Sequence, residues 1–420
     1  MEELRIEGGA RLKGSVTVSG SKNAALPALA AAVLTGGAVL RRVPRLADID
    51  TMCELLECLG CRVVRRGHTL RVSADDPSRT EAPYEIVSRM RASICVLGPL
   101  LAARGHARVA LPGGCAIGLR PVDLHLKGME ALGASISVEH GYIVARARRL
   151  KGAHVRLAGR FGPSVLATAN TMMAATLADG RSVIEPAAQE PEVVDLAAFL
   201  RGCGARITGA GTPRIEIEGV SALRAAEHTV IADRIEAGTY LLAAAATRSE
   251  VTVTRCRPKH LAALVGALRE AGFHVDGADG AVTVAPGGRR TRPLNVVTAP
   301  YPGFPTDLQP QTMALLSGAD GTSTITETVF PQRFTHAAEL ARMGARITQE
   351  GATAVVEGVG RLHGTEVEAS DLRAGAALVV AALSAEGVSR VRGLEHIDRG
   401  YEDLEGKLSS LGARITRSAV

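Results

Sequence analysis

Six stretches of the chain are apolar on nearly every face of a helix, and they recur about every 70 residues. Each is rich in alanine and begins with a polar or charged residue. A helix that is apolar all round is buried on all sides. The pattern therefore predicts one buried helix in each of six repeated units, at residues 22–34, 91–103, 164–178, 234–246, 307–318 and 373–385.

A second pattern has the same period, which is the kind of self-similarity that marks a repeat architecture. It consists of an apolar residue, a glycine, a small residue, any residue and a β-branched residue. The glycine is typical of a helix C-terminus, and the β-branched residue favours the start of a strand. We expect an outer amphipathic helix and strands in every unit. The six copies are residues 59–63, 132–136, 203–207, 271–275, 343–347 and 411–415.

The six units divide into two groups of three, with the boundary near residues 227–231. This predicts a two-domain α/β (α+β) protein. Ligands usually bind in clefts, so we expect the functional site in the cleft between the two domains.

Composition narrows the function classes. The chain has 420 residues, a formal net charge of +6 and no tryptophan. No basic run is interleaved with aromatic residues, which argues against nucleic acid binding. The longest apolar stretch, residues 24–34, is too short to span a bilayer, so no membrane insertion is expected. The seven cysteines form no even framework, which indicates a reduced, cytoplasmic protein.

The cysteines also include one C-x-x-C pair, Cys58 and Cys61, inside the first repeat. No second pair stands at zinc spacing, so a structural role is expected for both.

Cys115 stands in a glycine-rich loop, Pro112-Gly113-Gly114-Cys115-Ala116-Ile117-Gly118, and Arg120 follows it closely. A nearby guanidinium favours the thiolate and also binds anions through its planar fork. The combination predicts a reactive thiol that faces an anionic substrate. The alternative, a buried small apolar side chain, is disfavoured by the Pro-Gly-Gly sequence.

Cations stand at the start of three predicted buried helices, at Lys22, Arg91 and Arg373. A cation there opposes the helix dipole, which suggests that an anion lies nearby. Asp233 and Asp371 occupy equivalent positions, where N-capping alone explains them.

Several motifs together resemble one known family over essentially the whole chain. They are Ser19-Gly20-Ser21-Lys22-Asn23-Ala24-Ala25-Leu26-Pro27, the Cys115 loop, Phe304-Pro305-Thr306-Asp307-Leu308-Gln309, Thr326-Glu327-Thr328-Val329-Phe330, Asp371-Leu372-Arg373 and His396-Ile397-Asp398-Arg399-Gly400-Tyr401. The chain resembles the UDP-N-acetylglucosamine 1-carboxyvinyltransferase family of enolpyruvyl transferases, related to EPSP synthase.

The resemblance implies a reaction. Phosphoenolpyruvate donates its enolpyruvyl group to the 3'-hydroxyl of UDP-N-acetylglucosamine, phosphate leaves, and the path is addition followed by elimination through a tetrahedral ketal. This is the committed step of peptidoglycan synthesis. The resemblance implies no metal, no organic cofactor and no obligatory protein partner.

The resemblance also implies an inside-out α/β barrel fold with three repeats in each domain. Residues 22–231 would form an inserted domain, and residues 1–21 with 232–420 the second domain.

The family's roles carry over to matching positions for the donor, phosphoenolpyruvate. The resemblance makes Cys115 the acid that protonates the methylene carbon. Asp307 is implied as the base or orienting group at the acceptor hydroxyl, with N-capping of the following helix as its alternative. Asn23 would hold the tetrahedral intermediate, or cap a helix. The implied cations around the donor are Lys22, Arg120, Arg373 and Arg399.

A second set of positions matches those that bind UDP-N-acetylglucosamine. Within it, Arg333, like Arg373, could equally be a surface arginine in an arginine-rich chain. The set is Arg91, Arg120, Pro121, Val122, Asp123, Leu124, Ser164, Val165, Asp307, Val329 and Arg333.

Two segments depart from the family pattern. Residues 157–166 are longer than usual and end in Leu166 where glycine is common, and Pro331-Gln332 precede Arg333 in place of Glu-Asn. Leu166 leaves open a second reading, an enolpyruvyl transferase that uses another nucleotide such as UMP. A third is a non-catalytic protein that binds sugar nucleotides. Shikimate-type transfer is disfavoured by Cys115 and by the Lys22-Asn23 pair.

Overall fold

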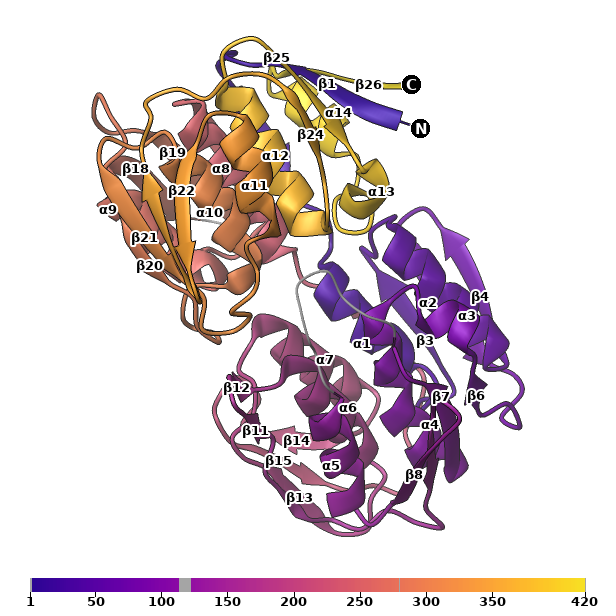
Figure 1. Ribbon diagram of the computed structural model, residues 1–420. Coiled ribbons are helices and arrows are strands. Elements are labelled where there is room, and N and C mark those ends of the chain that lie inside the picture. Colours follow the sequence, from indigo (N-terminus) through magenta and orange to yellow (C-terminus); the bar gives the residue numbers. More distant parts are fainter. Residues whose placement is uncertain (1, 113–121, 279, 420) are drawn as a thin grey trace. The chain divides into compact units, whose positions relative to one another are not determined.

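The structure, a computed structural model, describes residues 2–112, 122–278 and 280–419. The chain forms two compact units (Figure 1). The central unit contains the described residues of 20–231. The terminal unit contains residues 2–19 and the described residues of 232–419. Each unit has its own apolar core.

The described residues form six four-stranded sheets, three in each unit, and all six share one topology. The first pair of neighbouring strands is parallel, and the next two pairs are antiparallel. In the central unit the sheets are β16 (Ala226–Thr229), β3 (Gly37–Arg41), β5 (Thr69–Ala74), β4 (Cys61–Arg66); β6 (Glu81–Ala82), β7 (His106–Ala110), β9 (Tyr142–Arg146), β8 (Ser135–Glu139); and β10 (His154–Val155), β13 (Arg181–Ile184), β15 (Ile215–Glu218), β14 (Arg206–Thr208).

The terminal unit repeats this arrangement and uses strands from both ends of the chain. Its sheets are β2 (Lys13–Thr17), β17 (Glu250–Thr254), β19 (Ala281–Pro286), β18 (Phe273–Ala278); β20 (Asn295–Val297), β21 (Thr322–Thr326), β23 (Thr353–Glu357), β22 (Arg346–Glu350); and β24 (Glu366–Glu368), β25 (Val388–Arg392), β1 (Glu2–Glu7), β26 (Arg414–Ala419). The sixfold α/β repeat predicted from the sequence is confirmed.

The predicted buried helices are present and are buried along nearly their whole length, because small alanine side chains let the backbones approach closely. Two of them begin with a 3-10 turn before the α-helix. They are α1 (Lys22–Ala31), η1 with α4 (Arg91–Val96 and Leu97–Arg104), α6 (Val165–Ala175), α8 (Arg234–Ala246), η3 with α10 (Thr306–Leu308 and Gln309–Leu316) and α12 (Leu372–Ser384). Within the terminal unit, α8, α10 and α12 pack against one another.

The remaining helices are amphipathic or short. The outer helix of each repeat ends just before the motif glycine: α2 (Ala47–Cys58), α5 (Asp123–Ala131), α7 (Pro191–Gly202), α9 (Ala262–Glu270), α11 (Thr335–Arg342) and α14 (Leu404–Ser410). Short elements complete the fold: α3 (Tyr84–Val87), η2 (Pro258–Leu261), α13 (Leu394–Ile397) and a hairpin of β11 (Ala158–Gly159) and β12 (Gly162–Pro163).

The motif glycines have a conformational reason. Gly60 and Gly133, which end the first two outer helices, have φ of +79° and +91°. The other four have φ between +94° and +105°. Side chains other than glycine rarely adopt this left-handed region, so the glycines allow each helix to stop and each strand to start.

Two of these glycines make a matched test of helix termination. A Cβ at Gly60 would lie 2.2 Å from the backbone oxygen of Asp76, whereas one at Gly133 would meet nothing within 4 Å. We expect Gly133→Ala to lower the free energy of unfolding by about 1 kcal/mol through backbone strain alone. Gly60→Ala should lower it further by at least about 1 kcal/mol. Denaturant unfolding measures both, and equal losses would contradict the steric argument.

Candidate active site

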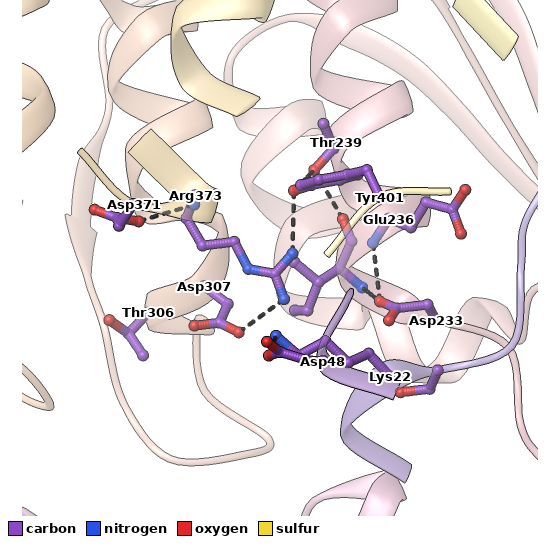
Figure 2. Close-up of polar contacts among 12 residues, drawn as sticks. Lys22, Asp48, Asp233, Glu236, Thr239, Thr306, Asp307, Asp371, Arg373 and Tyr401 are labelled. Atoms are coloured by element: carbon purple, nitrogen blue, oxygen red, sulfur yellow. Dashed lines mark hydrogen bonds and ion pairs between the residues drawn. The ribbon is translucent and has the colours of Figure 1, made fainter. Parts of the chain in front are cut away.

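One carboxylate in the terminal unit is shared by two buried arginines. Asp307, in η3, accepts a hydrogen bond from Arg333 Nη1 on Oδ1 at 2.7 Å. Its Oδ2 accepts from Arg373 Nη2 at 3.1 Å (Figure 2). The side chains of Arg333 and Arg373 are 3% and 2% exposed, and that of Asp307 is 27% exposed. The carboxylate therefore has one side against two fixed cations and part of its surface accessible to a ligand.

Two alternatives left open by the sequence are wrong. Arg333 and Arg373 are buried, so they are not surface arginines. Asp307 does not cap the helix that follows it, because no backbone N–H of that helix bonds to its side chain and its oxygens accept from guanidinium groups. The strong attraction of two buried cations outweighs the weaker pull of a helix N-terminus.

The cap of α12 sets the position of Arg373. Asp371 accepts from the backbone N–H groups of Arg373 at 2.8 Å and Ala374 at 3.1 Å, which begins the helix one residue before the arginine. Asp233 caps α8 in the same way. The expectation that these two aspartates are N-caps is confirmed.

The charges around Asp307 determine its protonation. Burial by itself raises the pKa of Asp307, but the guanidinium groups of Arg373 and Arg333 outweigh that effect and hold the pKa well below its usual range. Asp307 is therefore a carboxylate throughout the physiological range. Such a group accepts a hydrogen bond well and retains a proton poorly.

A second buried carboxylate, Glu327, is linked to Arg333 through the hydroxyl of Thr306. Arg333 Nη1 also donates to Thr306 Oγ1 at 3.1 Å, and the Thr306 hydroxyl donates to Glu327 Oε1 at 2.8 Å. Glu327 Oε2 accepts from the Thr298 hydroxyl at 2.9 Å. Burial raises the pKa of Glu327, although these hydroxyl donors oppose the shift. Thr306 and Glu327 stand within the motifs described above, and Thr298 stands outside them, but the sequence predicts no role for any of the three.

In the central unit, Lys22 begins α1 and forms an ion pair with Asp48. Their Nζ and Oδ2 atoms are 2.7 Å apart, and both side chains are less than 9% exposed (Figure 2). Asp48 lies in the first turn of α2. The anion anticipated beside Lys22 is thus, at least in part, a carboxylate of the protein. The sequence alone gave no signal for Asp48, because its position at a helix start is typical of any solvated acidic residue.

The polar start of α1 has a different cap from the one considered. Ser21 is the N-cap, and its hydroxyl oxygen accepts from Ala24 N–H at 3.3 Å. Asn23 is the second residue of the helix and is half-buried. The capping alternative for Asn23 is wrong, because the shorter serine side chain already occupies the capping position.

The structure places the other predicted ligand residues at helix starts of the central unit. Ser164 caps α6, which begins at Val165, and Val122 precedes α5, which begins with Asp123 and Leu124. Arg91 begins η1. These residues lie at three different helix N-termini, where backbone N–H groups can bind a diphosphate.

The segment that departs from the family pattern forms the β11–β12 hairpin, just before α6. Leu166, in the first turn of α6, packs partly against the core of the central unit. Part of its added bulk is therefore taken up by the protein interior.

In the terminal unit, Val329 lies in the loop after β21 and Arg399 follows α13; both are half-buried. Cys115, Arg120 and Pro121 lie outside the described residues.

The remaining cysteines are poor nucleophiles. Burial raises the pKa of Cys95 to about 12 and those of Cys53 and Cys203 to about 11. It also raises the pKa values of Cys58, Cys61 and Cys256. All six are free thiols. Because the thiolate is the reactive form, none of them suits covalent chemistry near neutral pH.

The described part of the chain has no cluster of histidine, cysteine or acidic residues suited to a metal ion. Within the same residues, no helix combines the length and hydropathy needed to cross a bilayer.

Comparison with known proteins places these features in context. The family described as EPSP synthase (3-phosphoshikimate 1-carboxyvinyltransferase) matches residues 6–408. The chain is 55% identical to UDP-N-acetylglucosamine 1-carboxyvinyltransferase 2 of Carboxydothermus hydrogenoformans, over 99% of each chain. It is 53% identical to UDP-N-acetylglucosamine 1-carboxyvinyltransferase of an Anaeromyxobacter species, again over 99% of each.

Solved structures agree on the fold. The enolpyruvyl transferase NikO from Streptomyces tendae superposes with a TM-score of 0.90 at 28% identity, covering 100% of this chain and 99% of the other. EPSP synthase from Acinetobacter baumannii, at 18% identity and a TM-score of 0.76 over 100% of both chains, shares the fold.

Replacing Asp307 tests the shared carboxylate. Asp307→Asn leaves two buried cations without their counter-charge, so we expect the free energy of unfolding at pH 7 to fall by about 3 kcal/mol. The folded-state pKa of Asp307 is depressed, so its contribution is present above the ordinary aspartate pKa of about 3.9 and is lost as the pH falls through the folded-state value. The difference between wild type and variant should therefore narrow below about pH 4.

Denaturant unfolding between pH 7 and pH 3 measures this difference. Asp320→Asn in the same unit is the control, because Asp320 pairs with Arg290 at the surface and should contribute less than about 1 kcal/mol. A loss at Asp307 that is the same at every pH would contradict the ion-pair account.

Proposed function

We propose that this chain, which belongs to the UDP-N-acetylglucosamine 1-carboxyvinyltransferases of the EPSP synthase family, is an enolpyruvyl transferase. It transfers the enolpyruvyl group of phosphoenolpyruvate to the 3'-hydroxyl of UDP-N-acetylglucosamine and releases phosphate. The observation that carries this proposal is full-length identity of 50% or more to enzymes of that name. The product enters peptidoglycan synthesis. The cytoplasmic location and the lack of an obligatory protein partner stay predictions.

The reaction balances in two steps. In the addition, the acceptor oxygen bonds to C2 of phosphoenolpyruvate, the hydroxyl proton leaves, and C3 takes up a proton to become a methyl group. In the elimination, C3 loses a proton, the C2–phosphate oxygen bond breaks, and inorganic phosphate departs. The protein must therefore supply an acid, receive a proton and stabilise the charge that develops at C2 and on the phosphate.

The donor carries a phosphate and a carboxylate, and we assign its binding to Lys22, Arg120, Arg373 and Arg399. Two of these assignments are supported by ion pairs within the protein. Asp48 holds Lys22 in a fixed position, and Asp307 does the same for Arg373. Preorganised charge stabilises a developing anion without reorganisation during the reaction. Asn23 is assigned to the tetrahedral intermediate.

We assign Asp307 to the acceptor hydroxyl as an orienting acceptor rather than as a strong base. Each of its oxygens already accepts one guanidinium N–H, and each retains a lone pair for a further donor. Its depressed pKa makes it a weak base at rest. The nucleotide is assigned to the helix starts that carry Arg91, Val122, Asp123, Leu124, Ser164 and Val165, with Arg120, Pro121, Val329 and Arg333 as further contacts.

The proposed function is tested by phosphate release. Purified protein incubated with phosphoenolpyruvate and UDP-N-acetylglucosamine should release inorganic phosphate and form the enolpyruvyl ether, which mass spectrometry identifies. UMP in place of the sugar nucleotide should give no release. Phosphate release with UMP but not with UDP-N-acetylglucosamine would support a different acceptor. Tight binding of the nucleotide without phosphate release would support a non-catalytic protein.

Cys115 is proposed as the acid that delivers the proton to C3. Cys115→Ala should abolish phosphate release or slow it greatly. Fosfomycin, a small epoxide phosphonate, should add one molecule to the wild-type protein in the presence of the sugar nucleotide, as judged by intact mass. Cys256→Ala is the matched control. Burial raises the pKa of the Cys256 thiol, so Cys256 is not the expected site of reaction and this variant should still be alkylated. An adduct that persists in Cys115→Ala would contradict this assignment.

A further inference from the structure

A buried tyrosine in the terminal unit, Tyr401, binds one terminal nitrogen of the Arg373 guanidinium, and Asp307 binds the other. Tyr401 is 2% exposed. Its hydroxyl oxygen lies 3.1 Å from Arg373 Nη1, 3.1 Å from Gln311 Nε2 and 2.9 Å from Thr239 Oγ1. Figure 2 shows Tyr401 between Thr239 and Arg373, with Asp307 beyond the guanidinium. The three partners come from α8, α10 and α12.

The hydrogen bonds around Tyr401 have one consistent direction. The Thr239 hydroxyl donates its proton to the Ile235 carbonyl at 2.9 Å, so toward Tyr401 it can only accept. Arg373 and the Gln311 amide nitrogen only donate. Tyr401 therefore donates to Thr239 and accepts from both Arg373 and Gln311. Burial raises the pKa of Tyr401, which keeps this proton in place.

This arrangement gives Arg373 two separate anchors. Nη1 is bound to Tyr401 and Nη2 to Asp307, and the guanidinium carbon lies 5.4 Å from the centre of the tyrosine ring. With only one of these hydrogen bonds, the planar guanidinium could rotate about that single contact. With both, the direction of the guanidinium and the position of the Asp307 oxygen are fixed together.

We propose that Tyr401 is a positioning residue, which sets the orientation of Arg373 and, through it, of Asp307. The inference rests on the proposed function, in which Arg373 binds the donor and Asp307 orients the acceptor hydroxyl. Tyr401 itself touches neither substrate in this proposal. Its hydroxyl matters because small displacements of a positioned group are costly, of the order of a hundredfold in rate for about 1 Å.

Tyr401→Phe removes this hydroxyl and keeps the ring. It should lower kcat/KM for phosphoenolpyruvate by about tenfold to a hundredfold, the range expected for one buried hydrogen bond to a charged group. Tyr240→Phe is the matched control. Tyr240 is equally buried in the same unit, and its hydroxyl interacts with Glu236 rather than with Arg373 or Asp307, so its loss should change kcat/KM less than about threefold.

A double-mutant cycle separates positioning from general destabilisation. If Tyr401 acts through Arg373, adding Tyr401→Phe to Arg373→Lys should cost less than about threefold. An equal loss in both backgrounds, or no loss in wild type, would overturn the inference. Should Tyr401→Phe fail to fold, Thr239→Val removes the acceptor of the Tyr401 proton at nearly constant volume. It should lower kcat/KM in the same direction, and no loss there would overturn the inference.

A second readout does not depend on turnover. In protein labelled with ¹⁵N-arginine, the guanidinium N–H signals of Arg373, assigned by comparison with Arg373→Lys, should exchange slowly with water. Tyr401→Phe should speed that exchange at least tenfold, and unchanged exchange would overturn the inference. Wild-type protein that releases no phosphate would instead refute the proposed function and leave this measurement valid.

Discussion

The terminal unit depends on one carboxylate that is shared by two guanidinium groups in its interior. Removing an ion from water costs several kcal/mol even after relaxation, so two buried arginines require a counter-charge at close range. Asp307 provides it with one oxygen for each arginine. Arg333 and Arg373 belong to different repeats, and the shared carboxylate therefore fixes the second and third repeats of this unit against each other.

The same principle explains how a core with so few aromatic residues can hold polar groups. The alanine-rich helices α8, α10 and α12 approach one another closely, and the space that remains between them is filled by hydroxyl, amide and guanidinium groups. Thr239, Tyr401, the Gln311 amide nitrogen and the two Nη atoms of Arg373 are each paired, whereas Gln311 Oε1 and Arg373 Nε have no hydrogen-bond partner among the described residues. Polar networks of this kind rigidify a core when they are satisfied, because an unpaired member is costly in a medium of low dielectric.

The repeat and its elements could be predicted from the sequence because they follow from local chemistry. A helix without a polar face must be buried, and a glycine after an outer helix permits the left-handed turn found at Gly60 and Gly344. The predicted helices at residues 91–103 and 307–318 differ from the structure at their first residues, because each begins as a 3-10 helix before the α-helix starts. Over so few residues, the apolar pattern does not distinguish a 3-10 helix from an α-helix.

The site was predictable in its residue types and not in its pairings. The motifs indicated Lys22, Asp307 and Arg373. However, an aspartate at a helix start looks the same in sequence whether it caps the helix or binds arginines 26 and 66 positions away. The long-range partner Asp48 has no local signature, because ordinary solvated residues have the same sequence context. Tyr401 ends one of the motifs, but the motif does not show that its hydroxyl contacts Arg373. Only the tertiary structure supplies those distances.

The first and last strands are neighbours in one sheet, where Glu2 to Glu7 pairs antiparallel with Arg414 to Ala419. The described residues of the central unit, in contrast, all lie between positions 20 and 231. During synthesis on the ribosome, residues 20–231 can therefore complete their core while translation continues. In the terminal unit, β1 lies between β25 and β26, so its last sheet is incomplete until residues 414–419 have been made.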